Sequence, residues 1–364
     1  MSCSITASID LAHLRHNYQL LRQRAGSAEL MAVVKANAYG HGLALIAPAL
    51  AQAGCRHFAV TDADEGAQLR AILGDAPDDR AHTIVTLSGL RDANDATTIT
   101  QHALTPAISD PQQLNDLQRA GFNGSVWIKV DTGMTRLGVT DLQATIQRCR
   151  QQRIGIAGIL SHLACADTAE HPLNRIQRER FHALRRNAEQ LLGRPIAASL
   201  LNSAGMVTLA DQMLDMVRPG IALYGAEPVI DQPLGVKPVM QLHAPIIQIR
   251  DIAAGTPVSY GASFTAPQTM RIAVIRGGYG DGLPRALSNR GCAWFDGQQL
   301  PIVGRVCMDY TMLDITRCPL KIGDRVELWG NHLAASAVAA AIDTISYTLF
   351  TGIHARVARI SQSS

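Results

Sequence analysis

The stretch that decides the fold is LMAVVKANAYGHG, residues 30–42, in which an uninterrupted apolar run ends at a lysine and a loop with two glycines. A short apolar run without polar alternation predicts a strand buried on both faces, as in a parallel sheet. Lys35 lies where that strand ends. A lysine at a strand end often extends into solvent. A desolvated lysine instead has a lowered pKa and can bond covalently to a carbonyl group.

Runs of the same kind recur along the next 190 or so residues, and helical spacing follows each of them. The eight runs are Leu30–Val34, His57–Val60, Thr83–Leu87, Leu104–Ile108, Ser125–Val130, Ile154–Leu160, Ala197–Leu201 and Leu214–Val217. Eight such units predict an α/β fold, a closed (β/α)8 barrel of the TIM type over residues 10–230. A doubly wound sheet is the alternative, which we rank lower because no Gly-x-Gly-x-x-Gly motif follows the first run.

Two features precede the first run. Residues Ser4 to Ile9 alternate polar and apolar, which is typical of a half-exposed strand in an antiparallel sheet. Asp10 is then suited to cap a helix, and Leu11, Leu14, Tyr18 and Leu21 continue at helical spacing up to Gly26. The sequence therefore predicts a strand followed by an amphipathic helix.

After Tyr224 the pattern changes to strand-like segments without regular helices between them. These segments are Val239–Arg250, Arg271–Arg276, Gln299–Met308, Thr311–Ile315 and Arg325–Trp329. Asp296-Gly297 is a hairpin turn signal, and Ala334–Ile342 suggests one short helix. We expect a mostly β domain over residues 231–364, which the N-terminal strand, residues 1–9, crosses over to join.

Composition narrows the classes of partner. The net charge of +3 is spread along the chain without blocks of like charge, which argues against nucleic acid or a membrane surface and favours a small-molecule substrate. No apolar run approaches the length of a membrane span, and the first residues lack a leader pattern. The seven cysteines show no C-x-x-C spacing, which favours reduced thiols and a cytoplasmic protein.

Polar residues follow several of the predicted barrel strands. Lys129 ends the fifth run and precedes Arg136, His162 follows the sixth, and Arg218 follows the eighth. Active sites of such barrels lie at the carboxyl ends of the strands, so we expect these side chains to converge with Lys35. Lys129 is unusual because it interrupts an apolar run, and a buried ammonium group needs a partner.

At this point the sequence resembles a known family, the alanine racemases that depend on pyridoxal 5′-phosphate (PLP). The resemblance covers essentially the whole chain and rests on eight motifs in the family's order. They are AVVKANAYGHG at 32–42, KVDTGMTRLG at 129–138, SHLACAD at 161–167, LNSAG at 201–205, VRPGIALYG at 217–225, VSYGASF at 258–264, GGYGDGLPR at 277–285 and GRVCMDY at 304–310.

The resemblance implies that Lys35 carries the cofactor covalently and that an arginine, Arg218, faces the pyridine nitrogen where many PLP enzymes have a carboxylate. It implies that PLP is held by Lys35, Tyr39, His162, Asn202, Ser203, Arg218, Gly220, Ile221 and Tyr347. The backbone N–H groups of Gly220 and Ile221 would help to bind the phosphate, since a glycine lets the backbone approach an anion closely.

The resemblance also implies two catalytic bases, because racemisation removes a proton from one face of Cα and returns one to the other. Lys35 would act on the D enantiomer, and Tyr260, contributed by a second subunit, on the L enantiomer. A site shared in this way requires a homodimer.

Further roles follow from the same resemblance. Arg136 and the Met308 backbone would bind the substrate carboxylate, while Tyr279 and Tyr347 would narrow the entrance and favour alanine. Lys129 would be an N6-carboxylysine, which removes the burial problem because its anion pairs with Arg136. No metal is implied.

Four alternatives stay open. A PLP-dependent decarboxylase shares the architecture but usually shows Glu-Pro-Gly-Arg, where this chain has Val217-Arg218-Pro219-Gly220. A racemase that prefers serine is a closer variant. A non-catalytic PLP carrier would leave residues 231–364 without a purpose, and a metal-dependent D-amino-acid lyase would need a His/Cys zinc pair. The sequence does not distinguish supply of D-alanine for peptidoglycan from its degradation.

Overall fold

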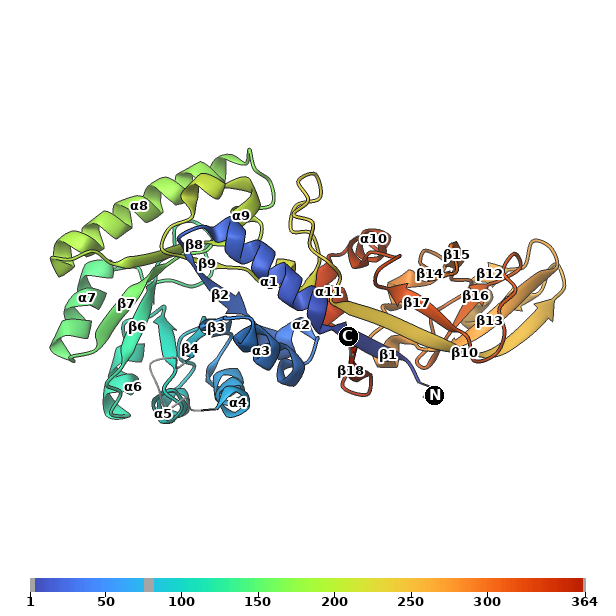
Figure 1. Ribbon diagram of the computed structural model, residues 1–364, viewed down its shortest axis with the longest axis horizontal. Helices are drawn as coiled ribbons and strands as arrows, with labels where there is room; N and C mark the ends of the chain where they lie inside the picture. The colour runs from blue at the N-terminus through green and yellow to red at the C-terminus, as the bar shows by residue number, and fades with distance from the viewer. Residues whose placement is uncertain (1–3, 75–81, 363–364) are drawn as a thin grey trace.

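A barrel and a β-rich domain lie at opposite ends of an elongated molecule (Figure 1). The structure, a computed structural model, describes residues 4–74 and 82–362. Residues 1–3 of the predicted N-terminal segment therefore lie outside the described residues, as does Cys3.

The predicted barrel is confirmed. Its strands pair in parallel in sequence order, and β9 returns to pair with β2 and close the ring. The strands are β2 (Glu29–Val33), β3 (His57–Val60), β4 (Thr83–Thr86), β5 (Thr105–Ile108), β6 (Ser125–Lys129), β7 (Gly155–Leu160), β8 (Ala197–Asn202) and β9 (Met216–Arg218). Most of their residues are buried, because side chains fill the interior of a small barrel and helices cover its outside.

Helices follow the strands and pack around them (Figure 1). They are α1 (Leu11–Ala25), α2 (Lys35–Tyr39), α3 (Leu43–Gln52), α4 (Ala63–Leu73), α5 (Ala93–Gln101), α6 (Gln113–Arg119), α7 (Leu142–Gln151), α8 (Pro172–Leu192) and α9 (Gly205–Thr208), with the 3-10 turns η1 (Ala210–Gln212) and η2 (Ile221–Tyr224). The predicted first helix is confirmed as α1: the Asp10 carboxylate accepts from the His13 amide at 2.9 Å, and Gly26 ends it at φ 61°. Within the described ranges, no helix is long and apolar enough to cross a membrane.

The second domain is built around the long strand β10, which pairs with β1, β13 and β17. In the described residues an eight-stranded sheet has the order β15-β14-β17-β10-β1-β18, with β13 beside β10 and β16 beside β13. The bounds are β1 (Thr6–Asp10), β10 (Met240–Ile252), β11 (Pro257–Val258), β12 (Phe264–Thr265), β13 (Met270–Arg276), β14 (Cys292–Phe295), β15 (Gln298–Pro301), β16 (Tyr310–Asp314), β17 (Arg325–Trp329) and β18 (Ala358–Gln362), with α10 (Ala335–Ala340), α11 (Ser346–Thr351), η3 (Tyr260–Ala262), η4 (Tyr279–Asp281) and η5 (Arg285–Leu287).

The two ends of the chain meet in this sheet. Strand β1 pairs antiparallel with β10 and parallel with β18 before the chain enters the barrel through α1. The buried Asn17 of α1 reinforces the junction, because its side chain accepts from the Lys237 amide at 2.7 Å and donates to the Leu223 and Lys237 carbonyls. One continuous hydrophobic core runs from the barrel into the second domain.

One predicted strand is partly wrong. Segment Gln299–Met308 is a strand only to Pro301, because Gly304 takes a positive φ of 79° and the Cys307 amide closes a turn onto the Tyr310 carbonyl. The Asp296-Gly297 hairpin between β14 and β15 is confirmed. Strand β18 and helix α11 were not predicted, because neither is marked by a long periodic pattern.

The second domain also contacts the loop that follows β2. Gly40, at φ 77°, lies so close to α11 that a Cβ there would overlap the Phe350 carbonyl oxygen. Arg359 of β18 donates to the Gly40 carbonyl at 3.0 Å and to the carbonyls of Ile353, His354 and Val357. The C-terminal part of the chain therefore holds the loop that begins at Lys35.

We predict that Gly40→Ala destabilises the protein more than Gly54→Ala. Both glycines have positive φ, but a Cβ at residue 54 would have nothing within 4 Å. The difference in free energy of unfolding therefore isolates the contact with α11, and overpacking of this kind costs about 1–3 kcal/mol. Thermal or urea unfolding of both variants measures it. Equal losses would contradict the close docking of this loop on α11.

Candidate active site

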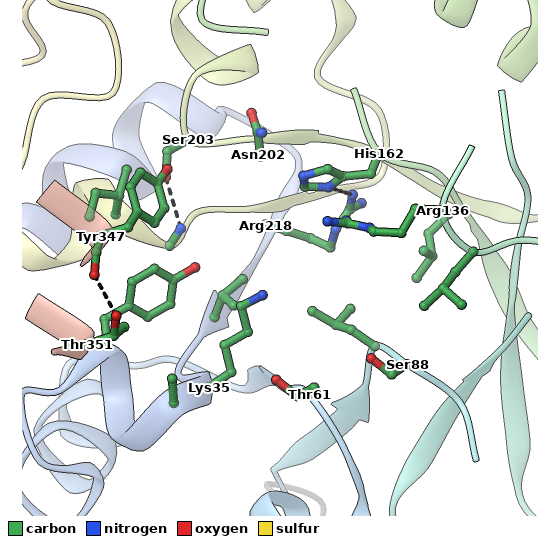
Figure 2. A pocket seen from close by; sticks show the side chains of 18 of the residues that line it. Lys35, Thr61, Ser88, Arg136, His162, Asn202, Ser203, Arg218, Tyr347 and Thr351 are labelled. Atoms are coloured by element: carbon green, nitrogen blue, oxygen red, sulfur yellow. Dashed lines mark hydrogen bonds between the residues drawn. The ribbon is translucent and has the colours of Figure 1, made fainter. Parts of the chain in front are cut away.

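A cavity of about 460 Å³ opens at the carboxyl ends of the barrel strands. Figure 2 shows that Lys35, Arg136, His162 and Arg218 surround it, with Ser203 and Tyr347 at one side. Among the residues singled out from the sequence, those that line it are Lys35, Tyr39, Lys129, Arg136, His162, Asn202, Ser203, Arg218, Gly220, Ile221 and Tyr347. Residues more than 300 positions apart in sequence therefore meet in one cavity.

Lys35 begins a turn with unusual backbone geometry. Residues Ala36 to Tyr39 all have φ between 51° and 54°, which is the left-handed helical region. This conformation costs roughly 1–2 kcal/mol for each residue that carries a Cβ, so tertiary contacts must hold it. Tyr39 stacks on Tyr224 with ring centroids 4.8 Å apart, and Asn37 Oδ1 accepts from the Leu43 amide at 2.7 Å.

The Lys35 amine has a perturbed affinity for protons. Burial lowers its pKa, and the Arg136 cation lowers it further, while the Glu65 carboxylate acts in the opposite direction. A lowered pKa leaves a larger fraction of neutral amine near pH 7, and the neutral amine is the nucleophile and the base.

One side of the cavity is an anion cradle, which we define as Tyr39, Ser203, Gly220, Ile221 and Tyr347. Ser203 Oγ accepts from the Gly220 amide at 2.9 Å, and a Cβ at Gly220 would overlap the Tyr39 hydroxyl. Burial raises the pKa of Tyr39 and Tyr347, so both hydroxyls stay protonated and can donate. Donors around a glycine suit a phosphate group.

Arg218 lies against the opposite part of the cavity and is buried, with 4% of its surface exposed. Its guanidinium donates to Ser199 Oγ at 2.5 Å, to the Leu200 carbonyl at 3.3 Å and to the Ser161 carbonyl. Burial lowers the pKa of Arg218 to about 10, so the group is still a cation at pH 7. Among the described residues its acceptors include a hydroxyl and carbonyl groups and no carboxylate, so its positive charge is not neutralised within the cavity.

His162 lies beside Arg218, with its Nδ1 3.4 Å from the guanidinium. Burial, followed by the cations of Arg218 and Arg136, lowers the pKa of His162 to about 3. The imidazole is therefore neutral. Gln177 of α8 holds this segment, because it donates to the His162 carbonyl at 2.9 Å and accepts from the Ala164 amide at 2.9 Å.

Lys129 is as unusual in the structure as in the sequence. It is 7% exposed, and its Nζ donates to the Leu87 carbonyl at 3.0 Å. Burial, followed by the cations of Arg218, Arg136 and Lys35, lowers the pKa of Lys129 to about 8. A substantial fraction of the amine is therefore neutral at neutral to mildly alkaline pH.

Arg136 completes the basic lining of the cavity. The Asp131 carboxylate folds the preceding loop by accepting from the amides of Gly133, Met134 and Thr135 at 2.8–3.0 Å. Within the described part of the chain, no hydrogen bond or ion pair holds the Arg136 guanidinium, so it is available to a ligand. None of the described lining residues is acidic, and the cavity is therefore suited to an anion.

Three residues singled out from the sequence lie outside this cavity. Tyr260 is 72% exposed on η3, and Met308 and Tyr279 are also exposed, in loops of the second domain. The Met308 carbonyl accepts from the Gly280 amide at 2.8 Å, which holds Met308 next to the Tyr279 turn. A single chain therefore does not bring these side chains to its own cavity.

The structure also identifies residues that the sequence reasoning missed. Tyr224 stacks on Tyr39 and donates to the Val33 carbonyl at 2.9 Å. Ser199 accepts a hydrogen bond from Arg218. Glu65 accepts from the Ala36 amide at 2.7 Å. Glu65 could have been suspected from its place soon after the second strand. The two others lie within apolar segments and carry no such signal. In the described ranges, no group of three or more His, Cys, Asp or Glu side chains is arranged to hold a metal.

Together, the barrel, the β domain and this basic cavity, with a lysine at the end of the first barrel strand, define a class of protein: (β/α)8-barrel enzymes with a site suited to an anionic small molecule. Two family descriptions narrow the class. "Alanine racemase, N-terminal domain" matches residues 9–228, and "Alanine racemase, C-terminal domain" matches residues 239–361. The chain belongs to the alanine racemase family.

Curated relatives agree over nearly the whole length. The catabolic alanine racemase of Agrobacterium fabrum is 39% identical over 362 residues, covering 97% of this chain and 90% of the relative. The alanine racemase of Azoarcus sp. is 39% identical over 354 residues, covering 96% of both chains.

Solved structures agree as well. The biosynthetic alanine racemase of Pseudomonas aeruginosa superimposes with a TM-score of 0.88 at 34% identity, over 100% of both chains. The alanine racemase of Bartonella henselae, described with covalently bound pyridoxal phosphate, gives a TM-score of 0.89 at 36% identity over 99% of this chain and 100% of that one.

PLP is the cofactor of this family of isomerases, and the residues present fit it. The anion cradle matches a phosphate group, and the absence of a Cβ at Gly220 lets the Tyr39 hydroxyl lie directly against the backbone of the cradle. Lys35 supplies an amine of lowered pKa for a carbonyl group, and the basic lining matches the remaining negative charge.

Proposed function

We propose that this protein is an alanine racemase that interconverts L- and D-alanine with PLP bound covalently through Lys35. The observation that carries the proposal is the barrel cavity, in which the Lys35 amine, an anion cradle and further basic side chains line one space. Membership of the alanine racemase family supports it. The similar proteins include one named a catabolic alanine racemase and one named a biosynthetic alanine racemase, so family membership does not assign the enzyme to the degradation or to the supply of D-alanine.

The chain would hold the cofactor at four places. The cradle residues and Asn202 would bind the phosphate side, and His162 would lie against the ring. Arg218 would face the pyridine nitrogen, and Arg136 the phenolic oxygen together with the substrate carboxylate. When bound, the cofactor withdraws electrons from the substrate Cα and makes its proton more acidic.

Arg218 would set the balance between racemisation and side reactions. The Arg218 guanidinium can only donate a hydrogen bond, and its positive charge would disfavour a second positive charge, so a pyridine nitrogen beside it would be left unprotonated and electron withdrawal would be limited. The site therefore favours early return of a proton to Cα over transamination. The absence of a carboxylate partner for Arg218 among the described residues supports this role.

Two bases would exchange protons with Cα from opposite faces. The neutral Lys35 amine would act on the D enantiomer, and Tyr260 of the partner subunit on the L enantiomer. Tyr260 is exposed and lies outside the cavity of its own chain, which supports the proposal that its side chain enters the cavity of a second copy. Met308 of the partner subunit would contribute its amide to the substrate carboxylate, and Tyr279 of the partner subunit would narrow the entrance with Tyr347.

These roles require a homodimer in which the two domains of each chain serve different active sites. We propose that residues 10–230 carry the cofactor, and that residues 231–364, with the N-terminal strand, supply the second base to another copy. The even distribution of charge and the reduced state of the described cysteines support a cytoplasmic enzyme without nucleic-acid or membrane partners.

We further propose that Lys129 is an N6-carboxylysine. Its pKa of about 8 makes the neutral amine available to carbon dioxide, and the resulting anion would offset the charge of Arg136. The buried position, which a cation occupies at a cost, supports this modification.

The first test is chiral analysis of alanine. We expect purified protein with PLP to convert L-alanine to an equal mixture of enantiomers and Lys35→Ala to give no D-alanine. Tyr260→Phe should lower kcat by roughly 10²- to 10⁴-fold, because a proton-transferring group is lost. Tyr310→Phe, another exposed tyrosine of the second domain, is the control. Faster racemisation of serine, or release of carbon dioxide from lysine or ornithine, would instead favour one of the alternatives.

The shared site has its own test. If each site combines Lys35 of one subunit with Tyr260 of the other, hybrids of Lys35→Ala and Tyr260→Phe subunits contain one intact site. Refolding the two variants together in equal amounts should then restore about a quarter of wild-type activity, because half of the dimers are hybrid. Lack of any recovery, with hybrid dimers demonstrated by mass, would mean that the two residues act within one subunit.

The modification of Lys129 predicts a pH dependence. The neutral amine is the form that reacts with carbon dioxide, so with bicarbonate adjusted to keep dissolved carbon dioxide constant across the pH series, recarboxylation after mild acid treatment should accelerate as pH rises through about 8. An unperturbed lysine would need a pH near 10. Recovery of activity on addition of bicarbonate measures the rate, with Lys129→Ala as the unresponsive control and Lys321→Ala as the responsive one. An intact protein without a labile carbon-dioxide adduct, and indifferent to bicarbonate, would rule the modification out.

A further inference from the structure

The carboxylate of Glu65, in the first turn of α4, joins the segments that follow the first two barrel strands. Its Oε1 accepts from the Ala36 amide at 2.7 Å, and its Oε2 accepts from the Thr61 amide at 2.7 Å. Ala36 directly follows Lys35, and Thr61 lines the cavity (Figure 2). One side chain therefore fixes the turn that carries the lysine to the end of the neighbouring strand.

The Ala36 amide finds its acceptor outside its own turn. Ala36 has φ 52° and ψ 53°, and it stands at the beginning of α2, where backbone N–H groups have no partner within the helix. The left-handed conformation is unfavourable for a residue with a Cβ. A hydrogen bond to a charged acceptor is stronger than one to a neutral acceptor, so the Glu65 carboxylate is well suited to hold this turn.

Glu65 also supplies negative charge near an otherwise basic cavity. In the described part of the chain it makes no ion pair with an arginine or lysine, and its charge acts on the Lys35 amine against the effects of burial and Arg136. The other charged or titratable groups at the cavity are cationic or neutral: Lys129, Arg136, Arg218, the neutral His162 and the protonated Tyr39 and Tyr347.

We propose that Glu65 is a positioning residue for Lys35. Its carboxylate clamps the Ala36 and Thr61 amides, so that the lysine enters the cavity in one orientation with a negative charge beside its amine. This inference deepens the proposed function and rests on it, because the orientation of Lys35 matters only if that amine bonds to the cofactor and moves a proton. Glu65 itself acts only through the backbone and its charge.

The test uses three variants. Glu65→Gln keeps the length of the side chain but has one acceptor oxygen, and its NH₂ group faces the second backbone N–H, so one hydrogen bond and the charge are lost. Glu65→Asp keeps the charge with a shorter reach. Asp64→Asn is the matched control, because it removes a negative charge one residue earlier on α4, from an exposed carboxylate that pairs with Arg91.

The measurement is the rate at which PLP attaches to the cofactor-free full-length chain, followed by absorbance as a function of pH. The neutral amine reacts, so the rate rises with pH to a plateau. In Glu65→Gln the plateau should fall by about tenfold or more, as expected for the loss of a charged hydrogen bond. Its midpoint should move to lower pH, because the charge that favoured the ammonium form is gone. Glu65→Asp should lower the plateau with a smaller shift, and Asp64→Asn should change neither.

Two outcomes would overturn the proposal. One is a plateau within twofold of wild type in Glu65→Gln, and the other is a lower plateau without an acid shift, which general disruption of the site would produce. If circular dichroism shows that Glu65→Gln is unfolded, Glu65→Asp decides in its place: an unchanged plateau overturns the proposal, and a lowered one supports it. A wild-type chain that attaches PLP but does not racemise alanine would refute the proposed function and leave this test intact.

Discussion

The excess of positive charge in the barrel cavity is the constraint on which the rest of the structure depends. Lys35, Lys129, Arg136 and Arg218 line one space, and no described lining residue is acidic. Lys129 and Arg218 are buried, where a charge without a counterion costs several kcal/mol, and the carbonyl and hydroxyl oxygens around them offset only part of this cost. An anionic cofactor bound in this cavity would supply the missing charge and would thereby stabilise the folded chain.

The same charge excess prepares the side chains for chemistry. Burial and neighbouring cations lower the pKa of Lys35, Lys129 and His162, each by the same physical cause. The result is a larger neutral fraction of the Lys35 amine, and a neutral imidazole at His162 beside the cation of Arg218. The Glu65 carboxylate, held by the Ala36 and Thr61 amides, opposes this lowering of the pKa at Lys35.

The backbone around Lys35 is strained, and contacts from distant parts of the chain hold it. Residues 36–39 form a left-handed turn, which persists because Glu65, Tyr224 and the α11 region contact it from three sides. Strain of this kind is found where function fixes the geometry. The second domain takes part through Arg359 and helix α11, which also carries Tyr347 into the cavity. It thus supports its own chain's site while exposing Tyr260 for the proposed role in another copy.

The sequence by itself determined the architecture and most of the cavity. Short continuous apolar runs that alternate with helical segments favour strands buried on both faces, and the carboxyl ends of barrel strands share one rim, so residues such as Lys35, His162 and Arg218 could be assigned to one site. Only the tertiary structure decided the left-handed turn, the clamp by Glu65, the stacking of Tyr224 on Tyr39 and the contact of Ser199 with Arg218. These depend on distances between elements far apart in sequence, and local patterns carry no information about such distances. The end of the strand at Pro301 was missed for a related reason, since a positive φ at Gly304 is set by packing against Val258 and Ser259.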